Sequence, residues 1–82
     1  MKTYIVTEIA KDSNIVLRSW VCFTKEQAKE CLQEHYKIAC TCNQLTGNET
    51  PTDCTEHGFF FWTLPNGMEM KYEIMDSVTY AD

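Results

Sequence analysis

The cysteine and histidine residues of this chain are the first candidates for chemistry. Cys40 and Cys42 stand two positions apart, and Cys54 and His57 follow with two residues between them. Thiolates and imidazoles hold zinc in small domains, where the metal often stabilises an irregular loop. The usual zinc knuckle is Cys-x-x-Cys, however, because side chains two positions apart diverge on a helix or a strand. We therefore expect no cofactor and cysteines that fill the core, with a zinc site formed by these four residues as the alternative.

A second candidate is the pair Cys31 and His35, which lie one turn apart on a predicted helix. Such a pair can form the thiolate and imidazolium of a cysteine enzyme, which is a third interpretation of the chain. A catalytic thiol needs exposure and an electropositive setting, whereas this pair falls on the apolar stripe of the helix. The sequence contains no phosphate-binding glycine loop, nucleophile elbow or His-Glu-x-x-His motif. We therefore predict that the protein is not an enzyme.

The elements that must position these residues are two hairpins on either side of one helix. Residues 4–9 and 15–23 read as strands joined by a turn, and Thr24 and Gln27 form a capping box that begins the helix. Residues 59–64 and 68–78 read as the second pair of strands. The helix stripe consists of Ala28, Cys31, Leu32, His35 and Ala39, and one side of the last strand consists of Met68, Met70, Tyr72 and Ile74, with Glu69, Lys71 and Glu73 on the other. This order predicts an α+β fold: a four-stranded antiparallel sheet with the helix on one face.

The chain is short enough for only one domain, which we place at residues 1–82. Within it, residues 43–58 are polar and contain two glycines and a proline, which predicts a long loop. Loops of this length are usually functional or mobile. The loop is therefore the first place to look for a site.

One helix covers only one face of a sheet, so the other face of an isolated domain should be polar. We assign Leu17, Val21 and Phe23 to the face under the helix. The opposite parity then places aromatic and apolar side chains on the uncovered face, which is typical of a partner-binding surface. The predicted partner-binding residues are Val16, Arg18, Trp20, Phe60 and Trp62. In the alternative interpretation, the long loop or residues 79–82 fold over this face and make a second small core.

Composition narrows the classes of partner. The net charge is −5, and residues 41–82 carry seven acidic side chains and one basic side chain. This balance argues against direct binding to nucleic acid and favours a basic protein partner. The sequence shows no membrane span and no signal peptide, so we expect a cytoplasmic protein with reduced thiols.

In size and element order the chain resembles small proteins of phages and mobile elements, among them anti-CRISPR inhibitors. The resemblance runs from Met1-Lys2-Thr3-Tyr4-Ile5-Val6 through the helix start at Phe23-Thr24-Lys25-Glu26-Gln27-Ala28. It concerns architecture and carries over no functional residue, because such inhibitors share no motif. The resemblance implies a stoichiometric binder that blocks a larger host protein in the host cytoplasm. The target would be a basic, nucleic-acid-binding protein, and a homodimer formed through the same surface is the other association considered.

Overall fold

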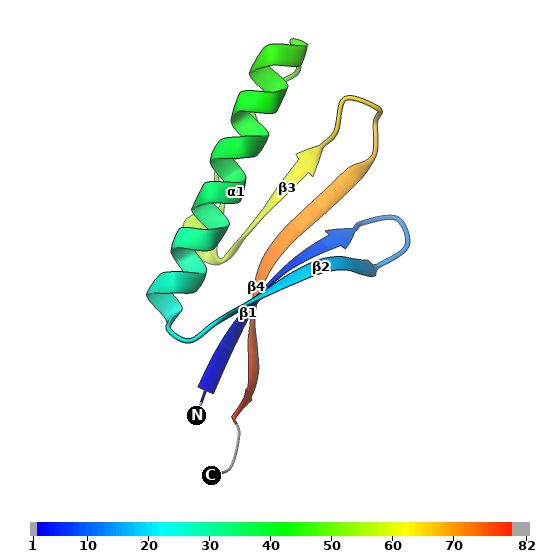
Figure 1. Cartoon of the computed structure of the whole chain (residues 1–82). Coiled ribbons are helices and arrows are strands. Elements are labelled where there is room, and N and C mark those ends of the chain that lie inside the picture. Colours follow the sequence, from blue (N-terminus) through cyan, green and yellow to red (C-terminus); the bar gives the residue numbers. More distant parts are fainter. Residues whose placement is uncertain (1, 80–82) are drawn as a thin grey trace.

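The computed structural model, which describes residues 2–79, shows one antiparallel sheet of four strands and one long helix (Figure 1). The elements in chain order are β1 (Lys2–Ala10), β2 (Ile15–Cys22), α1 (Lys25–Thr46), the short helix η1 (Thr55–His57), β3 (Phe59–Thr63) and β4 (Glu69–Thr79). The predicted α+β fold and its β-β-α-β-β order are confirmed.

The strand order across the sheet is β2-β1-β4-β3. The two hairpins therefore join through their inner strands, β1 and β4, which pair antiparallel in the middle of the sheet. Val6 on β1 lies opposite Trp20 on β2 and opposite Ile74 on β4. This arrangement leaves β2 and β3 as edge strands, each with one side that no other strand within residues 2–79 pairs.

The capping box predicted at Thr24 begins the helix. Thr24 is extended (φ −132°, ψ 157°), and its Oγ1 accepts a hydrogen bond from the Gln27 N–H at 3.1 Å. The Gln27 side chain reaches back to the N–H of Phe23 at 3.1 Å, one residue before the Thr24 N–H that a capping box uses. The Thr24 bond satisfies a donor that the first helical turn leaves free, and the Gln27 bond ties the residue before the cap to the helix.

The helix is longer than predicted, so the loop assigned to residues 43–58 begins only at Gly47. Gly47 adopts the left-handed conformation (φ 76°) and donates to Gln44, while Asn48 donates to the carbonyl of Asn43 at 2.8 Å. This is the pattern of a glycine-terminated helix. The polar composition of residues 43–46 was misleading because most of the last helical turn faces solvent, where polar side chains are compatible with a helix.

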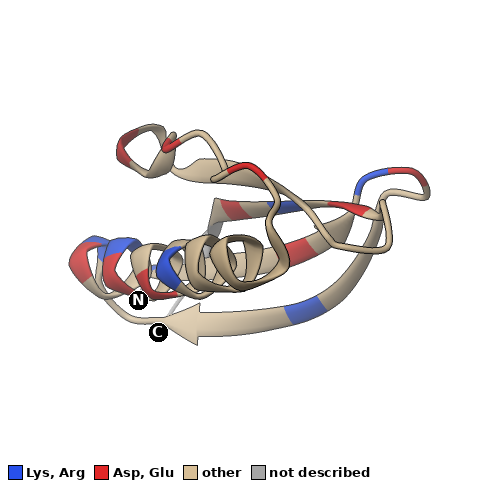
Figure 2. Ribbon diagram, turned by 90° about the horizontal axis from the view of Figure 1, so that it is seen from above, with Lys and Arg blue, Asp and Glu red and all other residues tan. Residues whose placement is uncertain are grey.

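The core lies between α1 and one face of the sheet. Its buried apolar members are Val6, Cys22, Ala28, Leu32, Ala39, Phe60, Met70 and Tyr72. The helix stripe was therefore predicted correctly, and so was the parity of Met70, Tyr72 and Ile74 on β4, whereas Met68 precedes β4 and is exposed. Seen from above, the helix lies along one side of the sheet, and acidic residues recur along the loop that follows it (Figure 2).

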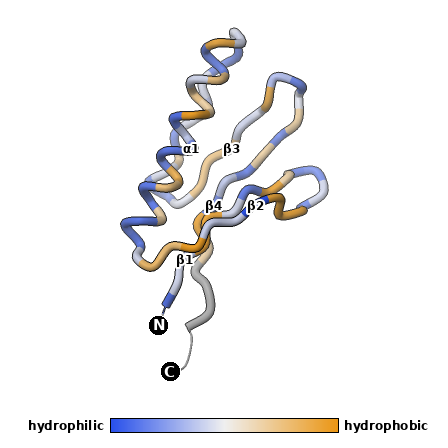
Figure 3. Tube along the Cα trace, viewed as in Figure 1, coloured by the Kyte–Doolittle hydropathy of each residue, from blue (hydrophilic) through white to orange (hydrophobic). Residues whose placement is uncertain are grey.

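The core parity of β2 was predicted wrongly. Cys22 is buried and Trp20 is partly buried against the core, whereas Leu17, Val21 and Phe23 are at least half exposed. Both parities of β2 carry apolar residues, so periodicity alone does not choose between them. Figure 3 shows the result as apolar colouring at both ends of this edge strand.

Candidate functional site

The face of the sheet opposite α1 carries exposed apolar side chains, and we call it the open face. Its apolar members are Ile5, Ile9, Val16, Val21, Phe59, Phe61 and Met75, placed there by the strand register. Val21 is 59% exposed, Val16 51%, Met75 46% and Phe61 44%. Ile5 lies between Val21 and Met75, so these three side chains form a row across three strands.

Charged side chains on the open face pair with one another. Lys71 Nζ lies 2.5 Å from Glu73 Oε2, and Lys11 Nζ lies 3.2 Å from Glu69 Oε2. Both ammonium groups also stand near the ring of Phe61, at 5.0 Å for Lys11 and 5.8 Å for Lys71. Exposed ion pairs contribute little to stability. They give the apolar row at Val21 a polar border, which is the usual anatomy of a protein interface.

Two of the predicted partner-binding residues lie under the helix and not on the open face. The Trp20 ring packs edge-on against the ring of His35 on α1, with centroids 4.2 Å apart. Phe60 is fully buried and stacks on Tyr72 at 4.8 Å. The prediction that Trp20 and Phe60 form an exposed surface was wrong, because the core needs large rings to span the space between sheet and helix.

The other three predicted residues divide between the two faces. The indole Nε1 of Trp62 donates to Oδ1 of Asn43 on α1 at 2.9 Å, so Trp62 also lies on the helix side. Arg18 is bonded to Glu8 on the helix-side parity. Val16 alone lies on the open face, opposite Ile9 of β1.

The open-face residues that the parity argument missed had one usable signal in the sequence. Glu69, Lys71 and Glu73 form the charged parity of β4, which must be the face away from the helix. Side chains that register places on the same face, such as Met75 and Phe61, are then exposed as well. The register itself depends on which strands are neighbours, and that information appears only in the fold.

A polar cluster occupies the helix-side face of the sheet. Arg18 binds both carboxylate oxygens of buried Glu8, at 3.0 Å from Nε and 2.8 Å from Nη2, and the Tyr72 hydroxyl donates to the same carboxylate. The Arg18 bonds hold the pKa of the Glu8 carboxyl below its usual range, against the effect of burial. Burial, reinforced by the bond to Glu8, raises the pKa of Tyr72 well above its usual range. Because both Glu8 oxygens are bonded, this carboxylate is a structural group and not a general base.

His35 lies beside this cluster with its Nε2 atom buried and without a hydrogen-bond partner among the described residues. Burial lowers the pKa of His35, and the nearby Arg18 charge lowers it further. Burial also raises the pKa of the Cys31 thiol. A neutral imidazole and a protonated thiol are the opposite of the ion pair that a cysteine nucleophile requires.

The candidate zinc ligands are not brought together. Among the residues that the structure describes, no group of three or more His, Cys, Asp or Glu side chains gathers closely enough to hold a metal ion. Cys42 lies on the outer surface of α1 beside Leu45, and His57 pairs with Glu56 at 3.3 Å. Cys40 and Cys54 both lie near the Tyr36 hydroxyl. A side-chain hydrogen bond with Cys40 is the main cause that raises the pKa of Tyr36 to about 12. All five cysteines are free thiols.

Within residues 2–79, no helix combines the length and the apolar character needed to cross a bilayer. Comparison of the chain with family models, with curated proteins and with solved structures finds no match. The proposals below therefore depend on the residues and the geometry of this chain.

Proposed function

We propose that this chain is a non-enzymatic protein-binding module and that the open face is its contact surface. The observation that carries the proposal is the exposure of Val21, Met75, Phe61 and Val16 on the same face of the sheet. Antiparallel sheets with one solvated face normally alternate apolar and polar residues, so that the solvated face is polar. The four exposed apolar side chains on the solvated face of this sheet instead favour a protein partner.

The energetics of this face suit an interface. Fully burying an aliphatic or aromatic side chain contributes about 1.5–3 kcal/mol, and these side chains are already about half buried. Four of them covered by a partner would then contribute roughly 3–6 kcal/mol before the costs of association. That is enough for a specific complex when the border residues also match their partners.

Charge indicates the chemistry of the partner. Residues 41–82 carry seven acidic side chains and one basic side chain, so a basic protein surface is the favoured complement. The inhibitor hypothesis comes from the resemblance to small phage proteins, and the acidic half suits it: a stoichiometric binder of this kind would occupy the basic groove of a nucleic-acid-binding host protein. A homodimer through the open face is the competing form of the same proposal.

The test is substitution of the most exposed apolar residue that the register places on this face. Val21→Glu should abolish association with the partner that co-purifies with the wild-type chain and leave the fold intact, because Val21 is 59% exposed. Leu45→Glu is the matched control, since Leu45 is 82% exposed but lies on the outer surface of α1. Sedimentation of the purified variants distinguishes a second copy from a different partner.

Retention of the partner by Val21→Glu would remove the open face as the contact surface. Loss with Leu45→Glu in place of Val21→Glu would transfer the interface to the helix surface formed by Ile38 and Leu45. Unchanged association across a range of salt concentrations would contradict the acidic half as a source of affinity.

A further inference from the structure

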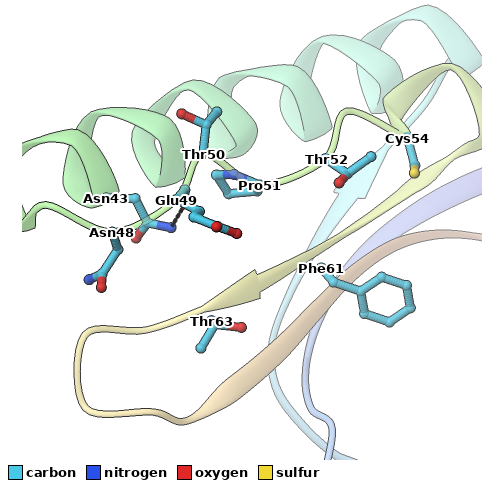
Figure 4. Close-up of a pocket in the computed structure, with 9 residues that line it drawn as sticks. All are labelled: Asn43, Asn48, Glu49, Thr50, Pro51, Thr52, Cys54, Phe61 and Thr63. Atoms are coloured by element: carbon cyan, nitrogen blue, oxygen red, sulfur yellow. Dashed lines mark hydrogen bonds between the residues drawn. The ribbon is translucent and has the colours of Figure 1, made fainter.

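A groove runs between β3 and the loop that follows α1 (Figure 4). Its volume is about 450 Å³, which is within the range of ligand-binding sites. One wall is formed by residues 48–52 and Cys54, and the other by Phe61 and Thr63 of β3. This groove lies along the edge strand β3, whereas Val21 lies on the opposite edge strand, β2.

Hydrogen bonds at the two ends of β3 fix the direction of its main-chain groups. Ile74 N–H donates to Gly58 O, and Leu64 N–H donates to Met68 O, each at 2.8 Å. In an antiparallel ladder, hydrogen-bonded pairs alternate with pairs that do not exchange bonds. Even-numbered residues from Gly58 to Leu64 therefore face β4, and the N–H and C=O groups of the odd-numbered residues point away from it.

The outward groups of β3 point toward the loop. The N–H of Phe59, the first odd-numbered residue, donates to the Cys54 carbonyl at 3.4 Å, which closes one end of the groove. Two and four residues farther along, Phe61 and Thr63 present the same outward geometry at the groove. No backbone hydrogen bond recorded for residues 2–79 outside the strand ladders involves Phe61 or Thr63. Their main-chain donors and acceptors are the free edge of the sheet.

Side chains from the helix hold the opposite wall in place. Asn43 Nδ2 donates to the Glu49 carbonyl at 2.8 Å, and the Tyr36 hydroxyl donates to the Pro51 carbonyl at 2.7 Å. Asn43 is itself 3% exposed and also accepts from the indole of Trp62 on β3. The loop and the strand edge are thus fixed to the same helix residue, so the groove exists without a ligand and binding would not have to order the loop.

We propose that this groove binds an extended, proline-free peptide segment that carries a lysine or arginine and adds as a fifth strand to the free edge of β3. Main-chain hydrogen bonds to Phe61 and Thr63 would supply the affinity, as in other proteins that bind peptides by strand addition. Glu49 carries the only charge among the nine residues that line the groove, which favours a basic side chain in the ligand. This site adjoins the proposed contact surface at Phe61, but it uses the main-chain groups of the strand edge and does not depend on the open-face proposal.

The test uses the wild-type chain and three end-capped heptapeptides. The first alternates threonine and valine around a central lysine, the second has glutamate in place of lysine, and the third is the first peptide with alternate backbone nitrogens methylated. Titration followed by amide NMR should shift the Phe61 and Thr63 signals and slow their hydrogen exchange with the lysine peptide. The methylated peptide should bind at least 10-fold more weakly, because it lacks the edge hydrogen bonds while its side chains are unchanged.

Two variants separate the contributions of the strand edge and of the Glu49 charge to peptide binding. Thr63→Pro removes one outward N–H but no hydrogen bond of the ladder, and an edge strand tolerates such a proline. This variant should bind the lysine peptide about 10-fold more weakly. Glu49→Gln should remove the preference for lysine over glutamate while binding persists. Val21→Glu should leave peptide binding unchanged, so that failure of the open-face proposal and failure of this one are distinguishable.

The proposal is overturned if the lysine peptide leaves the Phe61 and Thr63 amides unchanged at millimolar concentration. Equal affinity of the methylated peptide also overturns it, and this result does not depend on any variant folding. If the Phe61 and Thr63 amide signals shift when the protein is concentrated without peptide, a second copy of the chain occupies the edge of β3. The peptide is then not the ligand of this edge.

Discussion

Replacing Asn43 by alanine should destabilise the fold by about 1.5 kcal/mol, although the residue lies near the end of the helix. Its side chain accepts from Trp62 Nε1 at 2.9 Å and donates to the Glu49 carbonyl at 2.8 Å. It therefore joins three segments that are distant in sequence: α1, the loop and β3. Alanine removes both bonds and leaves the backbone bonds of the helix end in place.

The magnitude follows from what each partner loses. The Trp62 indole is partly buried against the core, so its N–H is left without a partner at a cost of about 1–3 kcal/mol. The carbonyl of Glu49 lies on an exposed loop and regains water, which costs little. The higher helix propensity of alanine offsets roughly 0.5 kcal/mol of this loss in unfolding free energy. The balance is about 1.5 kcal/mol, or a decrease in Tm of roughly 6–12 °C for a domain of this size.

Urea denaturation of Asn43→Ala, with Gln44→Ala as its control, measures this difference. Gln44 is the next helix residue and its side chain is exposed, so Gln44→Ala should change the unfolding free energy by no more than about 0.5 kcal/mol. The double variant Asn43→Ala with Trp62→Phe isolates the bond between the two side chains. Its loss of unfolding free energy should be about 1 kcal/mol smaller than the sum of the losses of the two single variants. Equal unfolding free energies for Asn43→Ala and Gln44→Ala would refute the reasoning, as would strict additivity in the double variant.

Two further stability predictions concern the start of the helix and the cluster beneath it. Thr24→Ala should lower the unfolding free energy by about 1 kcal/mol, because the Gln27 N–H loses its cap; an unchanged denaturation midpoint would contradict this cap. The pKa values of His35 and Glu8 are both lowered in the folded chain, so the unfolded chain binds more protons at low pH. Stability should therefore fall as pH drops below about 6.5 and fall further below about 4.5. His35→Leu should flatten the first of these two steps in denaturation curves recorded between pH 7 and pH 5, and an undiminished step would exclude His35 as its cause.

The predictions that succeeded depended on local signals. The capping box at Thr24 and the alternation that buries Met70 and Tyr72 are set by neighbouring residues, and they placed the elements correctly. Antiparallel pairing of short hairpins with a single helix leaves few other architectures. The fold class could therefore be predicted from one sequence.

The predictions that failed depended on long-range contacts. Trp20 and Val21 are both apolar, and only the pairing of β1 with β4 and the packing of α1 decide which of the two is buried. The end of the helix was missed for the same reason, because Asn43 is stabilised by partners six and nineteen residues away. Polar composition predicts a loop only where no tertiary contact satisfies the polar side chains.

The helix-side face of the sheet holds a polar cluster among the core rings. Glu8 is 7% exposed on its face of β1, and its carboxylate is compensated by Arg18 and Tyr72 on the same face. Both partners stand opposite Glu8 in the strand register, so the cluster belongs to the sheet and does not need the helix. The same face carries the rings of Phe60 and Tyr72, which bury more apolar area than the aliphatic row at Val21. Covering the larger rings is therefore the more favourable arrangement for the helix.

The open face is therefore left with exposed apolar side chains, and the free edge of β3 lies beside it. Phe61 belongs to both surfaces: its side chain lies on the open face near Lys11 and Lys71, and its main chain faces the groove. A strand added to β3 would extend the open face sideways by about 4.8 Å, the spacing between neighbouring strands. The two proposed surfaces are thus contiguous at Phe61. A single basic partner could place an extended segment in the groove and cover the apolar row with the domain that carries this segment.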